Sequence, residues 1–228
     1  MNAERPAGWV PGPAGPAWSR WLGRFMGRVV WNTMVVGADR VPEEGPVVLA
    51  ANHVAAIDGP LLIGLAPRAL HIISKQEMFH GALGLLLTWA GQIPVDRSNG
   101  RAALTASLGV LRRGGVVGIF PEGNRGRGEV TDVRSGAAWL AVHGGAPLVP
   151  VVFLGTRRTG ESTGHVPAFR RRLYMEFGEP VAPASQGPVR ERVGATSELL
   201  RAAMVALLAD AQSRTGIALP TDVPTRTP

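Results

Sequence analysis

Residues 47–58 read Val-Val-Leu-Ala-Ala-Asn-His-Val-Ala-Ala-Ile-Asp, and this stretch decides both the fold class and the place of the chemistry. Its uninterrupted apolar start is typical of a strand that is buried on both faces of a sheet. The run ends at Asn52-His53, and the carboxylate of Asp58 follows five residues after the imidazole. Such a pair can form a general base and its orienting partner. Taken alone, the pair is better explained as a structural histidine followed by an acidic helix cap, and only the other motifs of the chain reverse that interpretation.

The rest of the chain alternates strand patterns with helical patterns, which predicts an α/β fold with a mixed, mostly parallel sheet flanked by helices. Strands are expected over residues 31–37, 47–52, 70–74, 93–95, 116–120, 148–154 and 173–177. Helices are expected over residues 17–30, 59–66, 79–90, 101–113, 135–143 and 189–213. Catalytic groups in such folds gather beyond the carboxyl ends of strands. The polar residues that follow the strands at 47–52, 93–95 and 116–120 should therefore converge.

The chain divides into four segments. Residues 1–16 are rich in Pro, Gly and Ala and are expected to be flexible, and residues 214–228 form a Pro/Thr-rich tail of the same kind. Residues 17–30 are predicted to form a separate amphipathic helix. Residues 31–213 remain for one catalytic domain, which suits a chain of 228 residues that is 45% hydrophobic.

The helix predicted over 17–30 carries an apolar stripe with two tryptophans, and arginines recur on its opposite side. This pattern favours a helix that lies in a membrane interface. The alternative is a terminal helix that packs its apolar stripe on the domain. Gly23 and Gly27 weaken the helix in water, so we expect a lipid surface to order it.

Composition limits the partners and the chemistry. The net charge of +7 favours an anionic partner, namely nucleic acid, anionic lipid or a phosphorylated substrate. The arginines are scattered and match no nucleic-acid-binding signature, so no nucleic-acid partner is expected. The chain has no cysteine, which excludes thiol nucleophiles and disulfides, and no cluster has metal-ligand spacing. No apolar run reaches the roughly 18 residues of a spanning helix, so we expect a peripheral (monotopic) membrane protein. We also expect no bound metal or cofactor.

Three more motifs follow His53 and Asp58 in order: Gly-Gln-Ile-Pro-Val-Asp-Arg at 91–97, Phe-Pro-Glu-Gly-Asn-Arg at 120–125 and Val-Pro-Val at 149–151. Their order and spacing resemble the glycerolipid acyltransferase family, whose patterns are N-H-x4-D, G-x-I-x-V-D-R, F-P-E-G-T-R-S and V-P-V. The resemblance covers roughly residues 35–155. Asn124 and Gly126 stand where the family usually has Thr and Ser, and these departures concern the identity of the acceptor more than the chemistry.

The catalytic pair suits acyl transfer from a thioester to a hydroxyl. Neutral imidazole has a pKa near the working pH, so His53 can take the hydroxyl proton. Asp58 can accept from the far ring nitrogen and stabilise the imidazolium. The sequence offers no persuasive serine nucleophile and no cysteine, so direct attack by the acceptor fits better than an acyl-enzyme.

The resemblance assigns a phosphate clamp to Arg97 and Arg125, and guanidinium groups match phosphate with paired donors. Lys75 resembles a basic family position, although an ordinary surface lysine explains it almost equally well. Glu122 is expected to position the polyol or Arg125.

Three further expectations concern the ligand. Gly123 should let the backbone approach it closely, and Asn124 is expected to contact the acceptor. In the resembled family, the segment that contains Val149, Pro150 and Val151 lines the acyl site.

The resemblance implies an acyltransferase that moves an acyl chain from acyl-CoA or acyl carrier protein to lysophosphatidate, giving phosphatidate. We expect it on the anionic cytoplasmic face of a membrane. The alternatives are acylation of another lysolipid or a glycolipid, transacylation between phospholipids, or a catalytically silent lipid-binding protein. Acyl length, donor carrier and oligomeric state stay open.

Overall fold

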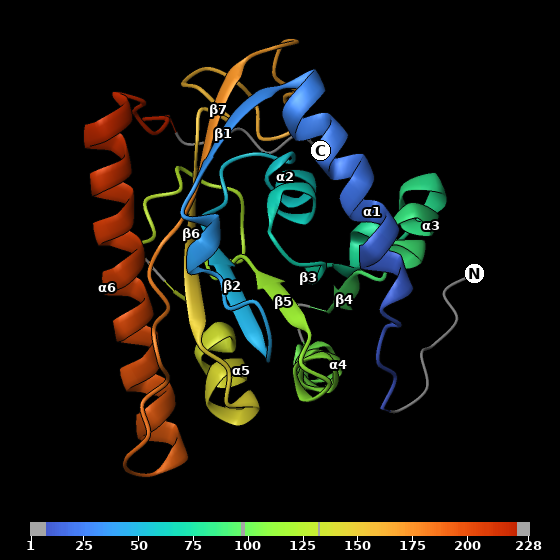
Figure 1. Ribbon diagram of the computed structural model, residues 1–228, viewed down its shortest axis with the longest axis vertical. Helices are drawn as coiled ribbons and strands as arrows, with labels where there is room; N and C mark the ends of the chain where they lie inside the picture. The colour runs from blue at the N-terminus through green and yellow to red at the C-terminus, as the bar shows by residue number, and fades with distance from the viewer. Residues whose placement is uncertain (1–7, 97–98, 132, 223–228) are drawn as a thin grey trace.

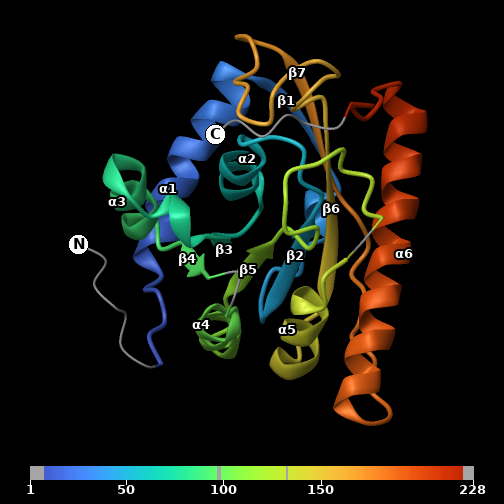
Figure 2. The same ribbon diagram turned by 180° about the vertical axis from the view of Figure 1, so that it is seen from behind.

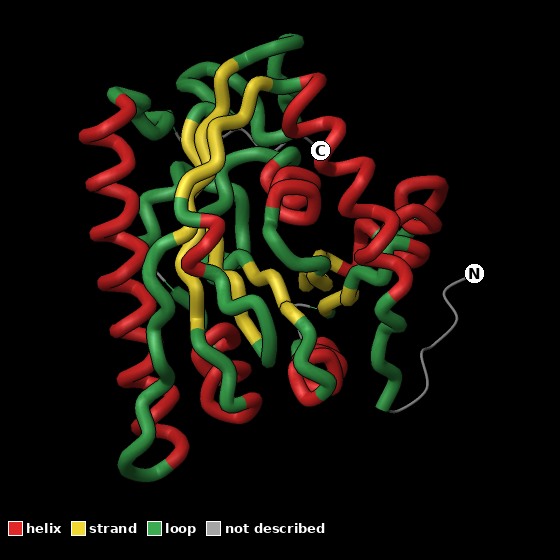
Figure 3. Tube along the Cα trace, viewed as in Figure 1, coloured by secondary structure: helices red, strands yellow, loops and turns green. Residues whose placement is uncertain are grey.

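The computed structural model describes residues 8–96, 99–131 and 133–222 (Figures 1 and 3). Its sheet has the strand order β1-β7-β6-β2-β5-β3-β4. The strands β6, β2, β5, β3 and β4 are parallel, whereas β7 is antiparallel to β6 and parallel to β1. The predicted mixed, mostly parallel sheet is thereby confirmed. The strands are β1 (Asn32–Val36), β2 (Val47–Ala51), β3 (Leu70–Lys75), β4 (Ile93–Val95), β5 (Val116–Ile119), β6 (Leu148–Leu154) and β7 (Arg172–Phe177).

Helices cover both faces of this sheet, as the two opposite views show (Figures 1 and 2). They are α1 (Ala14–Phe25), α2 (Asp58–Leu65), α3 (Gly81–Trp89), α4 (Arg101–Arg112), α5 (Gly136–Gly144) and α6 (Val189–Thr215). Short helical turns lie at Met26–Val30, Ala38–Arg40 and Gln76–Met78. In the described part of the chain, none of these helices is both long enough and apolar enough to cross a bilayer.

Strand β2 lies between two hydrophobic cores. Val48 and Ala50 pack in the core that contains residues of α4, α5 and α6, whereas Val47, Leu49 and Ala51 pack in the core that contains residues of α2. All five side chains are fully buried, which explains why this strand is a continuous apolar run rather than an alternating one.

Helix α1 rests on α2 through glycine. A Cβ on Gly23 would lie 2.7 Å from the Gly64 Cα, and a Cβ on Gly64 would lie 2.0 Å from the Gly23 carbonyl carbon. Gly27, in the turn that follows α1, packs instead against the Leu65 side chain. Gly23 does more than weaken the helix, as the sequence suggested, because it allows two helix backbones to touch.

The largest side chains of the apolar stripe on α1 are exposed. Trp21 is 72% exposed and Phe25 is 55% exposed. Helix α3 lies beside α1, where the Trp18 Nε1 donates to the Trp89 carbonyl oxygen at 3.2 Å, and Trp89 itself is 68% exposed. Two other members of the stripe, Met26 and Val30, pack against the core that contains residues of α2, so the membrane-interface helix and the packed terminal helix both stay open. The helix begins at Ala14, before the predicted Ala17, and its last turn, Met26–Val30, is π-helical.

Both segments that were expected to be flexible are packed where the structure describes them. Near the N-terminus, Trp9 and Val10 pack against the core. After α6, residues 216–222 fold back on a loop, where the Thr221 N–H donates to the Thr159 Oγ1 at 3.1 Å. These contacts between residues far apart in sequence leave no local pattern. The remainder of the two predicted segments lies outside the described residues.

Candidate active site

Four adjacent parallel strands end at one edge of the sheet and bring the polar motifs together. His53 follows β2, Phe120 follows β5, Lys75 ends β3 and Asp96 follows β4. All four line one cavity of about 800 Å³. The predicted convergence beyond the strand ends is confirmed for these residues, whereas Arg97 lies outside the described residues.

The His53 imidazole is held by a buried carboxylate. The Nδ1 of His53 lies 2.9 Å from the Oδ2 of Asp58, which also accepts from the backbone N–H groups of Val54 and Ala55 at 2.8 Å each. These two bonds explain the residues between the pair, because the tight turn aims their N–H groups at the carboxylate. Asp58 is not a helix cap: the N-cap position is Ile57, and the carboxylate points back into the turn.

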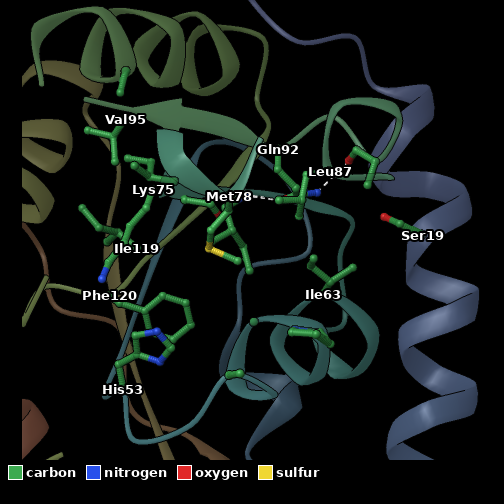
Figure 4. Close-up of a pocket in the computed structure, with 18 of the residues that line it drawn as sticks. Ser19, His53, Ile63, Lys75, Met78, Leu87, Gln92, Val95, Ile119 and Phe120 are labelled. Carbon is green, nitrogen blue, oxygen red and sulfur yellow. Dashed lines mark hydrogen bonds between the residues drawn. The ribbon is translucent and has the colours of Figure 1, made fainter. Parts of the chain in front are cut away.

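This arrangement fixes the tautomer and the charge of His53. A carboxylate acceptor places the ring proton on Nδ1 and leaves the Nε2 lone pair for a substrate proton. Burial lowers the pKa of His53 most strongly; Asp58 opposes this effect, and the positive charges of Arg125 and Lys75 add to it. The imidazole is therefore neutral near pH 7. It stacks on the Phe120 ring at a centroid distance of 4.0 Å and only 14% of the side chain is exposed (Figure 4).

The backbone of His53 is clamped from the loop that follows β5. Its N–H donates to the Glu122 Oε1 at 3.0 Å, and its carbonyl oxygen accepts from the Gly126 N–H at 2.9 Å. Glu122 thus holds the turn that carries His53, and its predicted contact with the polyol or with Arg125 stays a prediction. Burial, with smaller contributions from Asp58 and Glu129, raises the pKa of Glu122 to about 7 despite the hydrogen bond from His53.

Of the residues that the structure describes, three cations line the cavity, and one of them was not predicted from the sequence. Lys75 and Arg125 were predicted; Arg134 was not. The Arg134 side chain packs over Gly123, because a Cβ on Gly123 would lie 2.7 Å from the Arg134 Nε. Gly123 also has a φ of +70°, a backbone conformation that favours glycine. Arg134 belongs to a loop without periodicity, and the Gly/Arg-rich composition of that loop was its only signal.

One donor at the cavity has no partner among the described residues. The Nε of Arg125 is buried and makes no hydrogen bond there, although buried polar groups are almost always paired. Asn124, which was predicted to contact the acceptor, follows Gly123 in the same loop but is not among the residues that line the cavity.

Much of the remaining cavity lining is apolar and comes from α1, α2, α3 and the turns at Met26–Val30 and Gln76–Met78. It includes Leu22, Met26, Ile63, Met78, Leu83 and Leu87. Ile63, Met78 and Leu87 can be followed in Figure 4. Val149 and Val151 are instead fully buried in the core, and Pro150 lines a separate cavity of about 410 Å³ beside Glu176. Residues 149–151 are not among those that line the larger cavity, so the structure does not support the prediction that they line the acyl site. Among the described residues, no three histidine or acidic side chains gather to hold a metal ion.

Comparison with known proteins agrees with this geometry. A model of the Acyltransferase family matches residues 32–154. A 1-acyl-sn-glycerol-3-phosphate acyltransferase of Bacillus subtilis (strain 168) is 31% identical over 171 residues, which cover 73% of this chain and 83% of that protein. The human 1-acyl-sn-glycerol-3-phosphate acyltransferase beta is 33% identical over 120 residues, but these make up only 43% of its length and 50% of this chain.

The fold also has a relative among solved structures. The crystal structure of the 1-acyl-sn-glycerophosphate (LPA) acyltransferase PlsC from Thermotoga maritima superposes with a TM-score of 0.65, covering 85% of this chain and 80% of that one at 23% identity. The family match spans more than half of the chain, and the bacillar relative is covered over most of its length. The chain belongs to the acyltransferase family.

Proposed function

We propose that this protein transfers an acyl group from a thioester to the free hydroxyl of lysophosphatidate, giving phosphatidate. The observation that carries the proposal is a neutral, carboxylate-held imidazole in one cavity with three cations and an apolar interior. This combination matches an acceptor that has a hydroxyl, a phosphate and an acyl chain. The relatives from Bacillus subtilis and human are both named as 1-acyl-sn-glycerol-3-phosphate acyltransferases, and lysophosphatidate is that acceptor.

The reaction needs one base and no acyl-enzyme. The acceptor hydroxyl gives its proton to the Nε2 of His53 while its oxygen attacks the thioester carbonyl carbon. Asp58 stabilises the imidazolium through Nδ1–H. When the tetrahedral intermediate collapses, the C–S bond breaks and the imidazolium returns the proton to the leaving thiolate.

Lys75, Arg125 and Arg134 hold the acceptor phosphate in this proposal, and Arg97 stays a predicted fourth contact. The unpaired Arg125 Nε–H supplies a donor that a phosphate oxygen would satisfy. Acyl-CoA and acyl carrier protein both remain donors in the proposal, as substrates and not as bound cofactors.

We further propose that α1 and α3 lie on the anionic cytoplasmic face of a membrane. Their outward side chains Trp21, Phe25 and Trp89 form an exposed apolar surface, and both helices also line the cavity. Arg24 and Arg28 are exposed on α1, and the cytoplasmic leaflet carries the negative surface potential that attracts such side chains. A lipid substrate would then enter the cavity without leaving the bilayer.

Replacing the base tests the chemistry. His53→Ala should lower kcat by about a hundredfold or more, the usual worth of a general base. The control is His143→Ala on α5, which removes an exposed imidazole. A folded His53→Ala variant with near-normal turnover would overturn the mechanism. If the wild-type protein turns over no lysolipid acceptor with either donor, it is a lipid-binding protein instead.

Changing the acceptor tests the phosphate site. Arg125→Met should raise KM for lysophosphatidate much more than KM for monoacylglycerol, which has no phosphate. Arg127→Met is the matched control, since Arg127 pairs with Glu129 and is 44% exposed. An equal rise for both acceptors would remove the phosphate role.

Vesicle partitioning tests the membrane surface. The Trp21→Ser/Trp89→Ser variant should bind anionic vesicles at least tenfold more weakly, since burial of one large apolar side chain is worth roughly 1.5–3 kcal/mol. The control is Val205→Ser on α6, where the side chain is 40% exposed. Unchanged binding would place the membrane contact elsewhere.

A further inference from the structure

A short C-terminal segment, residues 216–222, folds back from α6 onto the loop at 156–161; we name it the strap. The Thr221 N–H donates to the Thr159 Oγ1 at 3.1 Å, and the Gly160 N–H donates to the Asp222 Oδ2 at 3.1 Å. The strap thereby places the Asp222 carboxylate beside Arg157.

Arg157 is a buried cation that the proposed chemistry does not use. Its side chain is 0% exposed, and its Nη1 donates to the Asp222 Oδ1 at 2.9 Å and to the Glu161 carbonyl oxygen at 3.0 Å. Within the described residues, Asp222 is its one ion-pair partner. A buried guanidinium without a carboxylate is strongly destabilised, so Asp222 fixes where Arg157 sits.

The other end of Arg157 reaches the loop that clamps His53. Its Nη2 donates to the Gly126 carbonyl oxygen at 3.5 Å and to the Asp222 carbonyl oxygen at 3.3 Å. The same Gly126 donates its N–H to the His53 carbonyl oxygen at 2.9 Å. A single residue, Gly126, therefore links the Arg157 guanidinium to the backbone of His53.

A second contact runs from the strap to the same turn. At Gly128, where φ is +77°, a Cβ would lie 2.5 Å from the Val54 Cγ1 and 3.6 Å from the Leu219 Cδ2. The backbone there is enclosed between the strap and the residue after His53. The Asn52 Nδ2 donates to the Gly128 carbonyl oxygen at 3.4 Å. The loop is thus attached to the catalytic turn on both sides of His53.

We propose that the strap is a positioning element of the active site. Asp222 acts through Arg157 and Gly126, Leu219 acts through Gly128, and both hold the turn that carries His53 in its reactive place. None of these strap residues touches a reacting atom. The proposal rests on the proposed role of His53 as the base.

The test is Asp222→Ala in the full chain, assayed at a temperature at which circular dichroism shows it folded. We expect kcat to fall about tenfold or more, because a misplacement of about 1 Å at the reacting groups can cost about a hundredfold. KM for lysophosphatidate and for the thioester should change less than twofold, since no binding contact is lost. Asp222→Asn, which keeps an acceptor for Arg157, should lose less. The control is Glu198→Ala, which removes an exposed ion pair of α6.

A double substitution separates positioning from a general loss of structure. In the His53→Ala background, Asp222→Ala should leave the residual rate unchanged, because its effect passes through the imidazole. A further tenfold loss there, or a folded Asp222→Ala variant with normal kcat, overturns the proposal. If Asp222→Ala fails to fold, Leu219→Ala replaces it: kcat should fall in the single variant, and the residual rate should not change in the His53→Ala background. Full activity in His53→Ala alone would instead overturn the proposed function.

Discussion

Replacing Asp58 with Asn isolates the charge that supports His53. The asparagine Oδ1 can take the place of the Asp58 Oδ2 and still accept the bonds from His53, Val54 and Ala55. What is lost is the charge-assisted bond to the imidazolium, worth roughly 1.5–3 kcal/mol. Because about 1.4 kcal/mol is tenfold in rate, kcat should fall about 10- to 150-fold.

The substitution also has a cost in stability that the structure identifies. The Asp58 Oδ1 is buried and has no hydrogen-bond partner among the described residues. The asparagine amide group would occupy that position with two unsatisfied N–H donors, which costs roughly 1–3 kcal/mol of unfolding free energy. The opposite amide orientation would point these donors at the N–H groups of Val54 and Ala55, which is worse.

The assay follows release of the donor thiol with a thiol-reactive dye, and the chain has no cysteine that would give a background signal. Asp58 is one of the contributions that raise the pKa of His53. Without its charge, the imidazole protonates at lower pH, so the acid limb of kcat/KM should move to lower pH while the plateau drops. Asp39→Asn, at an exposed position, is the control. A plateau within threefold of wild type with an unmoved acid limb would refute the reasoning.

Three other predictions follow from particular contacts. The Glu122 pKa of about 7 exceeds its ordinary value of 4.5. Between these two pH values the folded state therefore binds more protons than the unfolded state. The unfolding free energy should fall by up to roughly 3 kcal/mol as the pH rises from 4.5 to about 7. Glu122→Gln should abolish that fall in urea titrations at pH 5 and pH 7.5, and an unchanged pH dependence would contradict the assignment. Gly64→Ala should lower the unfolding free energy by about 1–3 kcal/mol, because the new methyl group collides with Gly23. The control Gly194→Ala, at a position on α6 with open space around it, should not lower it. Equal thermal midpoints for the two variants would disprove the close contact. Arg134→Gln should raise KM for lysophosphatidate while Arg134→Lys restores part of it, and a KM equal to wild type in Arg134→Gln would exclude Arg134 from the phosphate site.

The central strands β2 and β6 were predictable because burial on both faces leaves a continuous apolar run. Each predicted strand lies within one residue of the observed bounds. Parallel pairing then brings strand ends together, so the meeting of His53 with the segment after β5 also followed from the sequence.

The features that the sequence did not reveal depend on contacts between distant residues. The glycine at position 23 is explained by its close contact with Gly64. Nothing in the local sequence around either residue predicts that they meet. Arg134 enters the cavity because its loop returns past Gly123. The role expected of residues 149–151 came from resemblance alone, and these residues are not among those that line the cavity that contains His53.

The contact between Gly23 and Gly64 fixes the distance between α1, which is proposed to lie on the membrane, and the part of the domain that carries His53. Helix α2 begins at Asp58, and α1 touches α2 with no side chain in between. The height of the imidazole above the plane of α1 is thus set by backbone thickness and not by rotamers that can adjust. A lysolipid anchored in the bilayer presents its hydroxyl at a depth set by its own headgroup. In the proposed orientation on a membrane, selection among lysolipids would include a measurement of this depth, made before any residue of the cavity contacts the headgroup.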